Sequence, residues 1–426
     1  MIITLIATGS RGDVQPYVAL AKGLHQAGHT VRFFTHQNFE SLVVPHQLKF
    51  WPLEVDVQQI AQTEEMRQQV AGGNFLKLMS QMAKEAKRAA VLAAEGGVAA
   101  CQGTDLILGG MGGVFNGLAL AEKFNLPFLQ AYLVPFSPTQ EFPSVLVPGL
   151  PPFLSKIFNQ PSHHLTRQMI WQGFRSADQL ARKEVLGLPP APYFGPYHSP
   201  HLDRMPTLYG FSPSVISHPQ DWGKDIHITG YWFLDAEDHW TPPDELLNFL
   251  NAGPPPVYIG FGSMSNQRPK ETTDLIVNAL RQINQRGILL SGWGGLQTTE
   301  LSDSVMMVDS IPHAWLFPRM AAVVHHGGAG TTAAGMRAGV PSLVVPFFGD
   351  QPFWGQRIAE LGAGPSPIPR KKLTVDCLAQ AIHQAVTDDR IRQNAAVLGA
   401  RIQAEDGVAQ AVEIISQFEE RILNGA

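Results

Sequence analysis

The segment from Ala321 to Ala338 joins an apolar run, a glycine-rich turn and a stretch of small residues typical of a helix. Its centre reads His325-His326-Gly327-Gly328-Ala329-Gly330-Thr331-Thr332. The first backbone N–H groups of a helix lack intrahelical partners, and the helix dipole adds partial positive charge, so anions bind there. The segment predicts a strand, a turn and a helix start that cradle a phosphate, with a diphosphate preferred. The alternative is a turn that only tightens a strand–helix connection.

A second polar pair follows the next predicted strand, Ser342 to Val345, where the chain reads Gly349-Asp350-Gln351. Neighbouring strands of a parallel sheet present their carboxyl ends to one crevice, so this pair is expected close to the phosphate cradle. An acidic acceptor beside an amide suits the recognition of vicinal sugar hydroxyls. Asp350 also fits the N-cap of a helix, and both roles can coexist.

Strand-like and helix-like segments alternate twice along the chain, which predicts an α/β protein with two doubly wound parallel sheets. In the first half the expected strands are 2–7, 30–35, 105–108 and 127–131, and the expected helices are 16–27, 74–94 and 117–124. In the second half the expected strands are 257–261, 287–291, 305–308, 322–325 and 342–345, with a clear helix at 269–285 and only helices after Val375.

Composition limits the classes of protein that remain. The chain has 426 residues, 44% of them hydrophobic, and a net charge of −5, which gives no electrostatic reason to expect nucleic acid or a strongly anionic membrane as partner. Two cysteines, Cys101 and Cys377, provide neither a disulfide framework nor a zinc cluster, so a cytoplasmic location is expected. No apolar run reaches the length of a membrane-spanning helix, so any membrane contact is expected to be peripheral.

Four motifs in order resemble one known family. They are Gly9-Ser10-Arg11-Gly12-Asp13-Val14-Gln15-Pro16-Tyr17, the stretch 257–264, Ile311-Pro312-His313 with Trp315 ahead of the His-Gly-Gly segment, and Gly349-Asp350-Gln351. The series is similar to the nucleotide-sugar glycosyltransferases of the GT-B class, in particular sterol 3-beta-glucosyltransferases and glycopeptide-antibiotic glycosyltransferases. The resemblance implies two Rossmann-like domains facing each other across a cleft.

Prolines and tryptophans between Ser212 and Pro256 mark the expected domain junction. We therefore expect an acceptor-binding domain at 1–215, a linker at 216–256, a nucleotide-sugar-binding domain at 257–405, and a C-terminal helix at 406–426. In the family this last helix crosses back to the first domain. The oligomeric state is left open.

The resemblance implies UDP-glucose as the donor substrate, with a dTDP-sugar as the alternative, and no cofactor. In the family the residue matched by His326 contacts the first phosphate, while Thr331 and Ser263 lie near the second. Ser310 stands where plant relatives have the tryptophan that stacks on uracil, so Trp293 is expected either to stack on the base or to be a core residue. The expected nucleotide and diphosphate ligands are Ser10, Arg11, Gly12, Ser263, Trp293, Ser310, Ile311, His313, His326, Gly328, Ala329, Gly330, Thr331 and Thr332.

Glycosyl transfer needs a base for the acceptor hydroxyl, and Asp13, in the turn after the first strand, is the expected one. Asp13 also fits the cap of a helix beginning at Val14. There is no Asp-x-Asp motif, so a metal-independent, inverting reaction is expected. His325, next to His326 in a strand, should face the opposite way, which argues against a two-histidine metal site.

The proline-rich segment from Val134 to Pro161 excludes, on this reading, a central strand or a long helix. Its aromatic residues suit a lining for a hydrophobic acceptor, with Phe136, Thr139 and Phe142 as contacts, and the alternative is an ordinary loop packed on the core. Asp350 and Gln351 are expected to bind the sugar.

Other functions remain as alternatives. The expected acceptor is a sterol or another lipid, and a polyketide, carotenoid or flavonoid is the second choice. Residues 8–13 do not form the Gly-x-Gly-x-x-Gly motif of an NAD-dependent oxidoreductase. A non-catalytic nucleotide-sugar binder is the remote alternative, because such a protein would keep the phosphate cradle and lose the base, whereas Asp13 is present.

Overall fold

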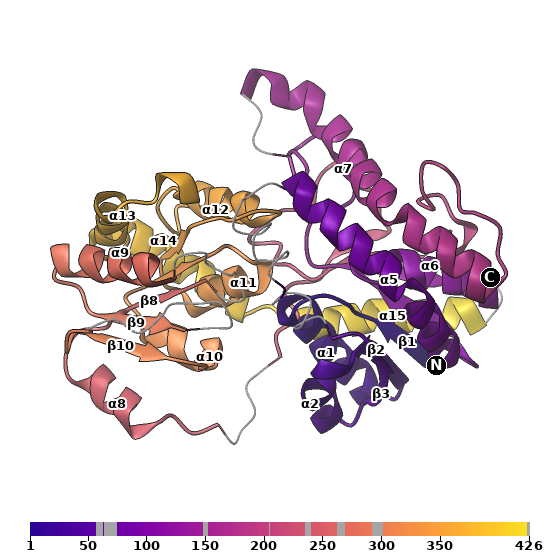
Figure 1. Cartoon of the computed structure of the whole chain (residues 1–426), viewed down its shortest axis with the longest axis horizontal. Coiled ribbons are helices and arrows are strands. Elements are labelled where there is room, and N and C mark those ends of the chain that lie inside the picture. The colour runs from indigo at the N-terminus through magenta and orange to yellow at the C-terminus, as the bar shows by residue number, and fades with distance from the viewer. Residues whose placement is uncertain are drawn as a thin grey trace. The chain divides into compact units, whose positions relative to one another are not determined.

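The computed structural model describes residues 1–56, 63, 75–147, 152–203, 205–234, 240–261, 269–291 and 301–423. These residues fall into two compact units (Figure 1). Of the described residues, unit 1 contains 1–56, 76–234 and 405–423, and unit 2 contains 63, 75 and 240–404. The last segment of the chain therefore belongs to the same unit as the first.

Unit 1 is built on a seven-stranded sheet in the order β3-β2-β1-β4-β5-β6-β7, with every neighbouring pair parallel. Nearly all residues of the central strands β1 and β4 are apolar and buried, as expected for a parallel sheet covered on both faces. The strands are β1 (Ile2–Ile6), β2 (Thr30–His36), β3 (Lys49–Leu53), β4 (Leu106–Gly109), β5 (Phe128–Tyr132), β6 (Thr207–Tyr209) and β7 (Ile226–Ile228).

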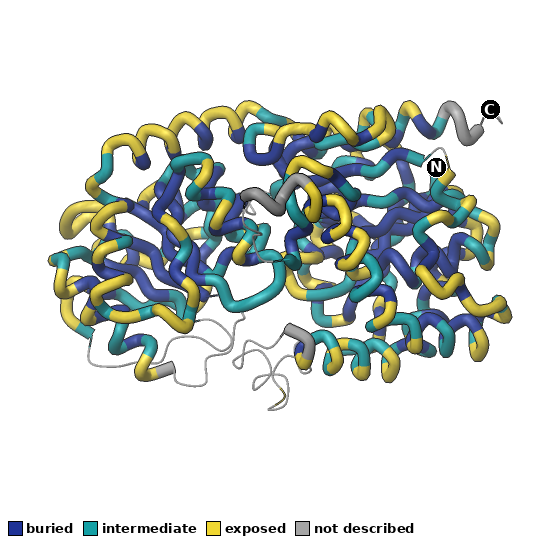
Figure 2. Tube along the Cα trace, turned by 90° about the horizontal axis from the view of Figure 1, so that it is seen from above, coloured by how far each residue is buried: buried dark blue, intermediate teal, exposed yellow. Residues whose placement is uncertain are grey.

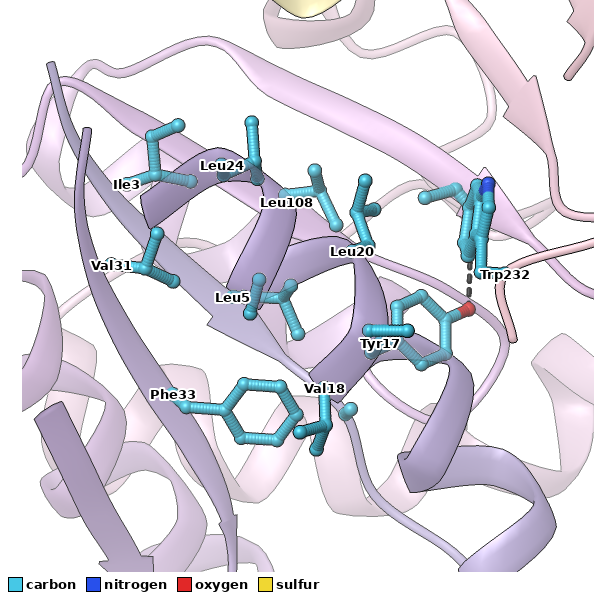
Figure 3. Close-up of a cluster of buried hydrophobic side chains, with 14 of the residues drawn as sticks. Ile3, Leu5, Tyr17, Val18, Leu20, Leu24, Val31, Phe33, Leu108 and Trp232 are labelled. Atoms are coloured by element: carbon cyan, nitrogen blue, oxygen red, sulfur yellow. Dashed lines mark hydrogen bonds between the residues drawn. The ribbon is translucent and has the colours of Figure 1, made fainter. Parts of the chain in front are cut away.

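Helices cover this sheet and connect its strands. They are α1 (Arg11–Gln26), α2 (Glu40–Val43), α5 (Phe75–Cys101), α6 (Val114–Phe124), α7 (Pro152–Ala181) and α15 (Gly407–Leu423). Short helices lie at Gln37–Phe39, Val44–His46, Arg182–Leu186 and Pro200–Leu202. Figure 3 shows the core between α1 and the sheet, where Leu20 and Leu24 meet Leu5, Val31 and Leu108.

Helix α15 completes the same core although it comes last in the sequence. Ala411 and Ile415, one turn apart, are fully buried in it. A Cβ atom on Gly23 of α1 would lie 2.4 Å from a methyl carbon of Val408, so the glycine allows the two helices to pack closely.

Unit 2 has a five-stranded parallel sheet in the order β10-β9-β8-β11-β12. The strands are β8 (Val257–Gly260), β9 (Gly287–Leu290), β10 (Val305–Val308), β11 (Ala322–His325) and β12 (Ser342–Val344). Figure 2 shows buried strands inside and exposed turns of helix outside. The helices are α8 (Asp244–Asn251), α9 (Pro269–Gln282), α10 (His313–Leu316), α11 (Ala329–Ala338), α12 (Gln351–Glu360), α13 (Val375–Thr387) and α14 (Asp389–Gln403), with short helices at Phe317–Arg319 and Arg370–Lys372.

The two parallel sheets confirm the predicted fold class, and the expected strands of unit 2 lie within a residue or two of those observed. Three short strands of unit 1 were not predicted. Among them β3 contains Pro52, which is tolerated because β3 is at the edge of the sheet. Helix α1 also begins at Arg11, five residues before the expected start, with Pro16 inside it.

The expectation that residues 134–161 exclude a long helix is wrong. Helix α7 begins at Pro152 and continues through Pro161 to Ala181. Proline is favoured at the first position of a helix, where its missing N–H group has no intrahelical partner to lose. Pro152 therefore marks a helix start. Pro161 costs one main-chain hydrogen bond within a helix of 30 residues.

Candidate functional site

The start of helix α11 has the main-chain geometry expected of an anion site. Strand β11 ends at His325, Gly327 turns with φ of 93°, and Gly328 caps the helix in an extended conformation. The helical hydrogen bonds begin with Thr332 N–H donating to the Gly328 carbonyl at 2.9 Å. Within the described residues, the N–H groups of the four preceding residues have no main-chain acceptor outside the helix. These groups are therefore available to a ligand.

The imidazole of His326 lies directly against this helix start. A Cβ atom built on Gly328 would lie 2.5 Å from His326 Nε2, closer than two such atoms can approach, so the imidazole occupies this position only because residue 328 is glycine. Burial, followed by the charge of nearby His313, lowers the pKa of His326 to about 4. The side chain is therefore neutral at pH 7 and carries one N–H donor.

His325 supports the turn. Its Nδ1 accepts the N–H group of Gly327 at 3.1 Å, so the proton of the neutral ring is on Nε2. The ring is fully buried, and burial, with the nearby His326 and His313, lowers its pKa well below the ordinary value. The rings of His325 and His326 are 6.5 Å apart and nearly perpendicular. In the described part of the chain, no three His, Cys, Asp or Glu side chains are grouped to hold a metal ion.

The two threonines of the cradle have different environments. Thr331 is partly exposed at the helix start, whereas Thr332 is fully buried. The Thr332 hydroxyl thus lies inside unit 2, while Gly330 is exposed and Ala329 partly so. Of the two hydroxyl groups, only that of Thr331 lies where a ligand outside the protein can reach it.

The loop between β12 and α12 is fixed by its own polar side chains. Gln351 is buried, and its Oε1 accepts the N–H groups of Phe347 at 2.7 Å and Phe348 at 3.2 Å. Asp350 is the N-cap residue of α12, but its carboxylate makes no side-chain cap and instead accepts the indole N–H of Trp354 at 2.8 Å. Val345 N–H donates to the His325 carbonyl at 2.9 Å, so this loop begins beside the cradle.

The residues expected around the nucleotide base differ in how far they are exposed. Ser310 is exposed after β10, and Ile311 is buried in the apolar cluster behind it. His313 stacks on Phe317 with ring centres 4.3 Å apart, and its Nε2 lies 3.4 Å from the Tyr258 hydroxyl oxygen. Ser263 and Trp293 lie outside the described residues.

A cavity of about 370 Å³ in unit 2 lies at the amino ends of the strands, whereas the cradle lies at their carboxyl ends. Pro255, Gln285, Ala321 and Pro341, which line it, each precede the start of a strand. Ligands of such sheets bind at the carboxyl ends of the strands, so the cradle at α11 is the better candidate site.

In unit 1 Asp13 lies in the first turn of helix α1, just after the connection from β1. Its Oδ2 accepts the backbone N–H of Ser10 at 2.8 Å and the Ser10 hydroxyl at 2.7 Å, and Gly9, with φ of 132°, leaves room for the carboxylate. The residue is exposed, so an acceptor can reach it. Although Asp13 keeps contact with solvent, the protein atoms around its carboxyl group displace part of its hydration and so raise its pKa, and the Ser10 bonds oppose this rise.

Asp13 was expected in a turn, or as the cap of a helix beginning at Val14, but it is the third residue of α1, and its partner Ser10 was not predicted. A serine at the N-cap with an acid three residues later is the spacing of a capping box, and that signal was present in Ser10 and Asp13. Arg11 and Gly12 are exposed beside them, and Arg11 donates to Gln15 at 2.9 Å. Trp354, which holds Asp350, was also missed; it stands one helical turn after Asp350.

The three predicted acceptor contacts lie within the packing of unit 1. Phe136 is buried against Tyr132, and Thr139 is fully buried with its hydroxyl donating to Asp221 at 2.6 Å. Phe142 is partly exposed, and its ring lies 6.5 Å from that of Trp222 in a T-shaped arrangement. Their role in acceptor binding stays a prediction.

Comparison with solved structures agrees with the fold described above. The calicheamicin glycosyltransferase CalG4 superposes with a TM-score of 0.67 at 17% identity, covering 98% of both chains. The glycosyltransferase VinC, solved in complex with dTDP, gives 0.67 at 20% identity over 99% of this chain and 100% of VinC. The two parallel-sheet units are thus those of the GT-B glycosyltransferase fold.

Two family models also match the chain. Residues 3–143 match the glycosyltransferase family 28 N-terminal domain, and residues 288–420 match the erythromycin biosynthesis protein CIII-like C-terminal domain. A sterol 3-beta-glucosyltransferase of Arabidopsis thaliana is 38% identical over 96% of this chain and 67% of its own length. One of Neosartorya fischeri is 36% identical over 97% of this chain and 29% of its own length.

The chain belongs to the sterol 3-beta-glucosyltransferase family of glycosyltransferases. It spans about two thirds of the length of the plant relative and less than a third of the fungal one. No helix among the described residues is long and apolar enough to span a membrane.

Proposed function

We propose that this protein transfers glucose from UDP-glucose to the hydroxyl group of a sterol. The observation that carries the proposal is the match to sterol 3-beta-glucosyltransferases over nearly the whole chain, at 38% identity with the plant relative. The anion site at the start of α11 supports it, because a sugar nucleotide needs a place for its diphosphate.

In this proposal the diphosphate binds the free N–H groups at Gly328 to Thr331, with the Thr331 hydroxyl and the neutral imidazole of His326 as further donors. When the sugar leaves, negative charge builds on the diphosphate, and donors already in place stabilise it without rearrangement. Ser263 and Trp293 complete the proposed nucleotide site from outside the described residues. Ser310, Ile311 and His313 are proposed near the base, and Ser10, Arg11 and Gly12 near the diphosphate.

Asp350 and Gln351 are proposed to recognise the sugar. The carboxylate of Asp350 is held by Trp354, and the side chain of Gln351 is held by two main-chain amides, so both are fixed before the donor binds. Such preorganisation lowers the entropic cost of binding.

The proposed base is Asp13. Its carboxylate removes the proton of the acceptor hydroxyl, the oxygen attacks the anomeric carbon from the face opposite the diphosphate, and the bond from that carbon to the diphosphate oxygen breaks. UDP leaves and the configuration is inverted. The raised pKa makes Asp13 a stronger base than an ordinary aspartate, which favours proton transfer near neutral pH. No metal takes part in this scheme.

The second candidate function differs in the acceptor and in the nucleotide of the donor. The fold is shared with the glycosyltransferase of calicheamicin and with VinC in complex with dTDP, so a natural-product acceptor with a UDP- or dTDP-sugar is the second candidate. A sterol resides in membranes, so the proposal includes a cytoplasmic enzyme with peripheral membrane contact. We propose Phe136, Thr139 and Phe142 as residues that shape the acceptor side from within unit 1.

The test offers the purified protein UDP-glucose or dTDP-glucose with a panel of sterols, polyketides and flavonoids, with products identified by mass spectrometry. We expect a sterol glucoside from UDP-glucose with inverted configuration by NMR. Asp13→Asn should keep its affinity for UDP, measured by calorimetry, and lose about 10²- to 10⁴-fold in turnover. Undiminished turnover in this variant contradicts the base assignment, and a product formed only from non-sterol acceptors contradicts the proposed substrate.

A further inference from the structure

Ser10 donates two hydrogen bonds to one oxygen of the proposed base. Its backbone nitrogen and its hydroxyl oxygen lie 2.8 and 2.7 Å from Oδ2 of Asp13. A capping box includes the first of these bonds, but it uses the serine hydroxyl only as an acceptor for the backbone of the third helix residue. The bond from the hydroxyl proton to the carboxylate is therefore additional to the capping of α1.

The two bonds make the oxygens of this carboxylate different. A Cβ atom on Gly9 would lie 2.7 Å from Oδ2, so this oxygen also packs against the main chain of the turn. Among the described residues, no donor forms a hydrogen bond to Oδ1. Because Asp13 is exposed, Oδ1 is the oxygen that a bound acceptor can reach.

The turn that carries Ser10 is anchored on a neighbouring turn of unit 1. Thr8 Oγ1 donates to the Gly112 carbonyl at 2.6 Å, and a Cβ atom on Gly112 would lie 2.1 Å from the Thr8 carbonyl oxygen. Gly112 belongs to the connection between β4 and α6, and β4 pairs directly with β1. This close packing fixes the main chain of the turn, so the Ser10 hydroxyl holds the carboxylate from a fixed position.

Two other titratable side chains of α1 lie near the carboxylate, and both have other partners. Arg11 Nε donates to Gln15 at 2.9 Å. The hydroxyl of the buried Tyr17 donates to the Ala131 carbonyl at 2.5 Å. Burial, followed by the charge of Asp13, raises the pKa of Tyr17, so this side chain stays neutral. Neither side chain therefore replaces the serine as the donor to the carboxylate.

We propose that Ser10 is a positioning residue of the reaction: it holds Oδ2 of Asp13, so that Oδ1 faces the acceptor and receives its proton. The proton leaves the acceptor oxygen for Oδ1, and Oδ2 becomes the carbonyl oxygen of a neutral acid, which still accepts both bonds from Ser10. The donors therefore need not move during the transfer. The inference rests on the proposed function, because it requires Asp13 to be the base.

This role is incompatible with a simultaneous bond from the Ser10 hydroxyl to the diphosphate. A serine hydroxyl has one proton to donate, and here that proton is directed to Oδ2 of Asp13. Ser10 can thus lie near the diphosphate, but its hydroxyl serves the base. The bond also favours the charged form of the carboxyl group, so it opposes the rise in pKa that burial causes.

The experiment compares Ser10→Ala with the unchanged protein, using UDP-glucose and a sterol. We expect kcat to fall about 10- to 100-fold, because small displacements of a catalytic group have effects of this size. The acidic limb of the kcat/KM profile should move to higher pH, and the affinity for UDP in calorimetry should be unchanged. Ser10→Thr keeps a hydroxyl and a favourable N-cap, so it should recover most of the turnover. Thr374→Ala removes an N-cap hydroxyl from α13, and this control for lost capping should behave as the unchanged protein does.

An NMR titration of the Asp13 carboxyl carbon provides a readout that does not depend on turnover. Its signal is identified by its absence from Asp13→Asn. In Ser10→Ala the pKa of this group should be higher than in the unchanged protein, because one bond to the charged form is lost. An equal pKa in both proteins overturns the inference, even if no acceptor is turned over.

A double-mutant cycle with Asp13→Asn separates action through the base from direct action on the diphosphate. If Ser10 acts through Asp13, adding Ser10→Ala to Asp13→Asn should have little further effect on turnover. Losses that multiply, or a weaker affinity of Ser10→Ala for UDP, assign the hydroxyl to the diphosphate and overturn the inference. Either result beside a large loss in Asp13→Asn leaves the proposed base intact. Undiminished turnover in Asp13→Asn contradicts the base, and this inference with it.

Discussion

The close contact between Gly328 and His326 gives the sharpest test of the cradle. In Gly328→Ala the new Cβ atom would lie 2.5 Å from His326 Nε2 and 3.3 Å from two ring carbons, so the imidazole must move away. The main chain itself tolerates alanine, since Gly328 has φ of −62° and ψ of 142°. The variant therefore displaces one side chain without distorting the turn.

The expected magnitude follows from the bond that is lost. A hydrogen bond to a charged group contributes about 1.5 to 3 kcal/mol, so losing the bond from His326 to the phosphate should weaken UDP binding about 10- to 150-fold. Because His326 is only partly buried, we expect its imidazole to move rather than the main chain of the turn to shift. We therefore expect the free energy of unfolding to change by less than about 1 kcal/mol, mostly through the poorer N-cap.

The assay is titration calorimetry of UDP in a double-mutant cycle. His326→Ala alone should weaken binding by a similar factor, and adding Gly328→Ala to it should have little further effect, because the side chain that the Cβ displaces is already absent. Gly330→Ala is the matched change in the same turn, where a Cβ would meet no protein atom within 4 Å. Any loss of affinity in Gly330→Ala then reports close approach of the phosphate itself. Equal losses from Gly328→Ala with and without His326 would refute the reasoning.

Other expectations concern the supports of the site and of unit 1. Gln351→Leu leaves the N–H groups of Phe347 and Phe348 without their acceptor and should lower the free energy of unfolding, measured by urea denaturation, by about 2 kcal/mol. The control Gln356→Leu, on the exposed side of α12, should change it by less than about 0.5 kcal/mol. Equal effects of the two changes contradict the role given to Gln351. Burial lowers the pKa of His163 to about 4, below the unfolded value of about 6.5, so its contribution to stability is present above pH 6.5 and is lost as the pH falls toward 4. Between about pH 4 and 6.5 the free energy of unfolding should depend less on pH in His163→Gln than in the unchanged protein. The control His383→Gln, at an exposed position, should behave as the unchanged protein does. Identical slopes in all three proteins contradict the role given to His163.

Much of the fold could be predicted because local pattern and tertiary environment agree. The strands of unit 2 are buried on both faces, so they appear in the sequence as short apolar runs such as Ala322 to Val324. The turn at Gly327 was visible for the same reason, since a positive φ requires glycine there. The three-residue strands β6 and β7 were not visible, because their pairing depends on β5 and on chain segments far away in the sequence.

The site was predictable in its main chain and less so in its side chains. The glycine-rich turn predicted a helix start between Gly328 and Thr332, but the sequence could not distinguish the buried hydroxyl of Thr332 from the accessible one of Thr331. Nor could it show that Gln351 is occupied by main-chain amides, because that depends on how the preceding loop folds back. The prediction that residues 134–161 exclude a long helix was wrong because it depended on the number of prolines and not on their positions relative to the start of α7.

The return of the chain to unit 1 after residue 404 has a consequence for the order of folding. Residues 240–404 are continuous, so unit 2 can close as soon as they leave the ribosome. The face of α1 around Gly23 must wait for Val408 and Ala411, and stays uncovered while some 170 intervening residues are synthesised. The unit that begins the chain is thus the last to mature. Pulse proteolysis of stalled nascent chains should find unit 2 resistant before unit 1.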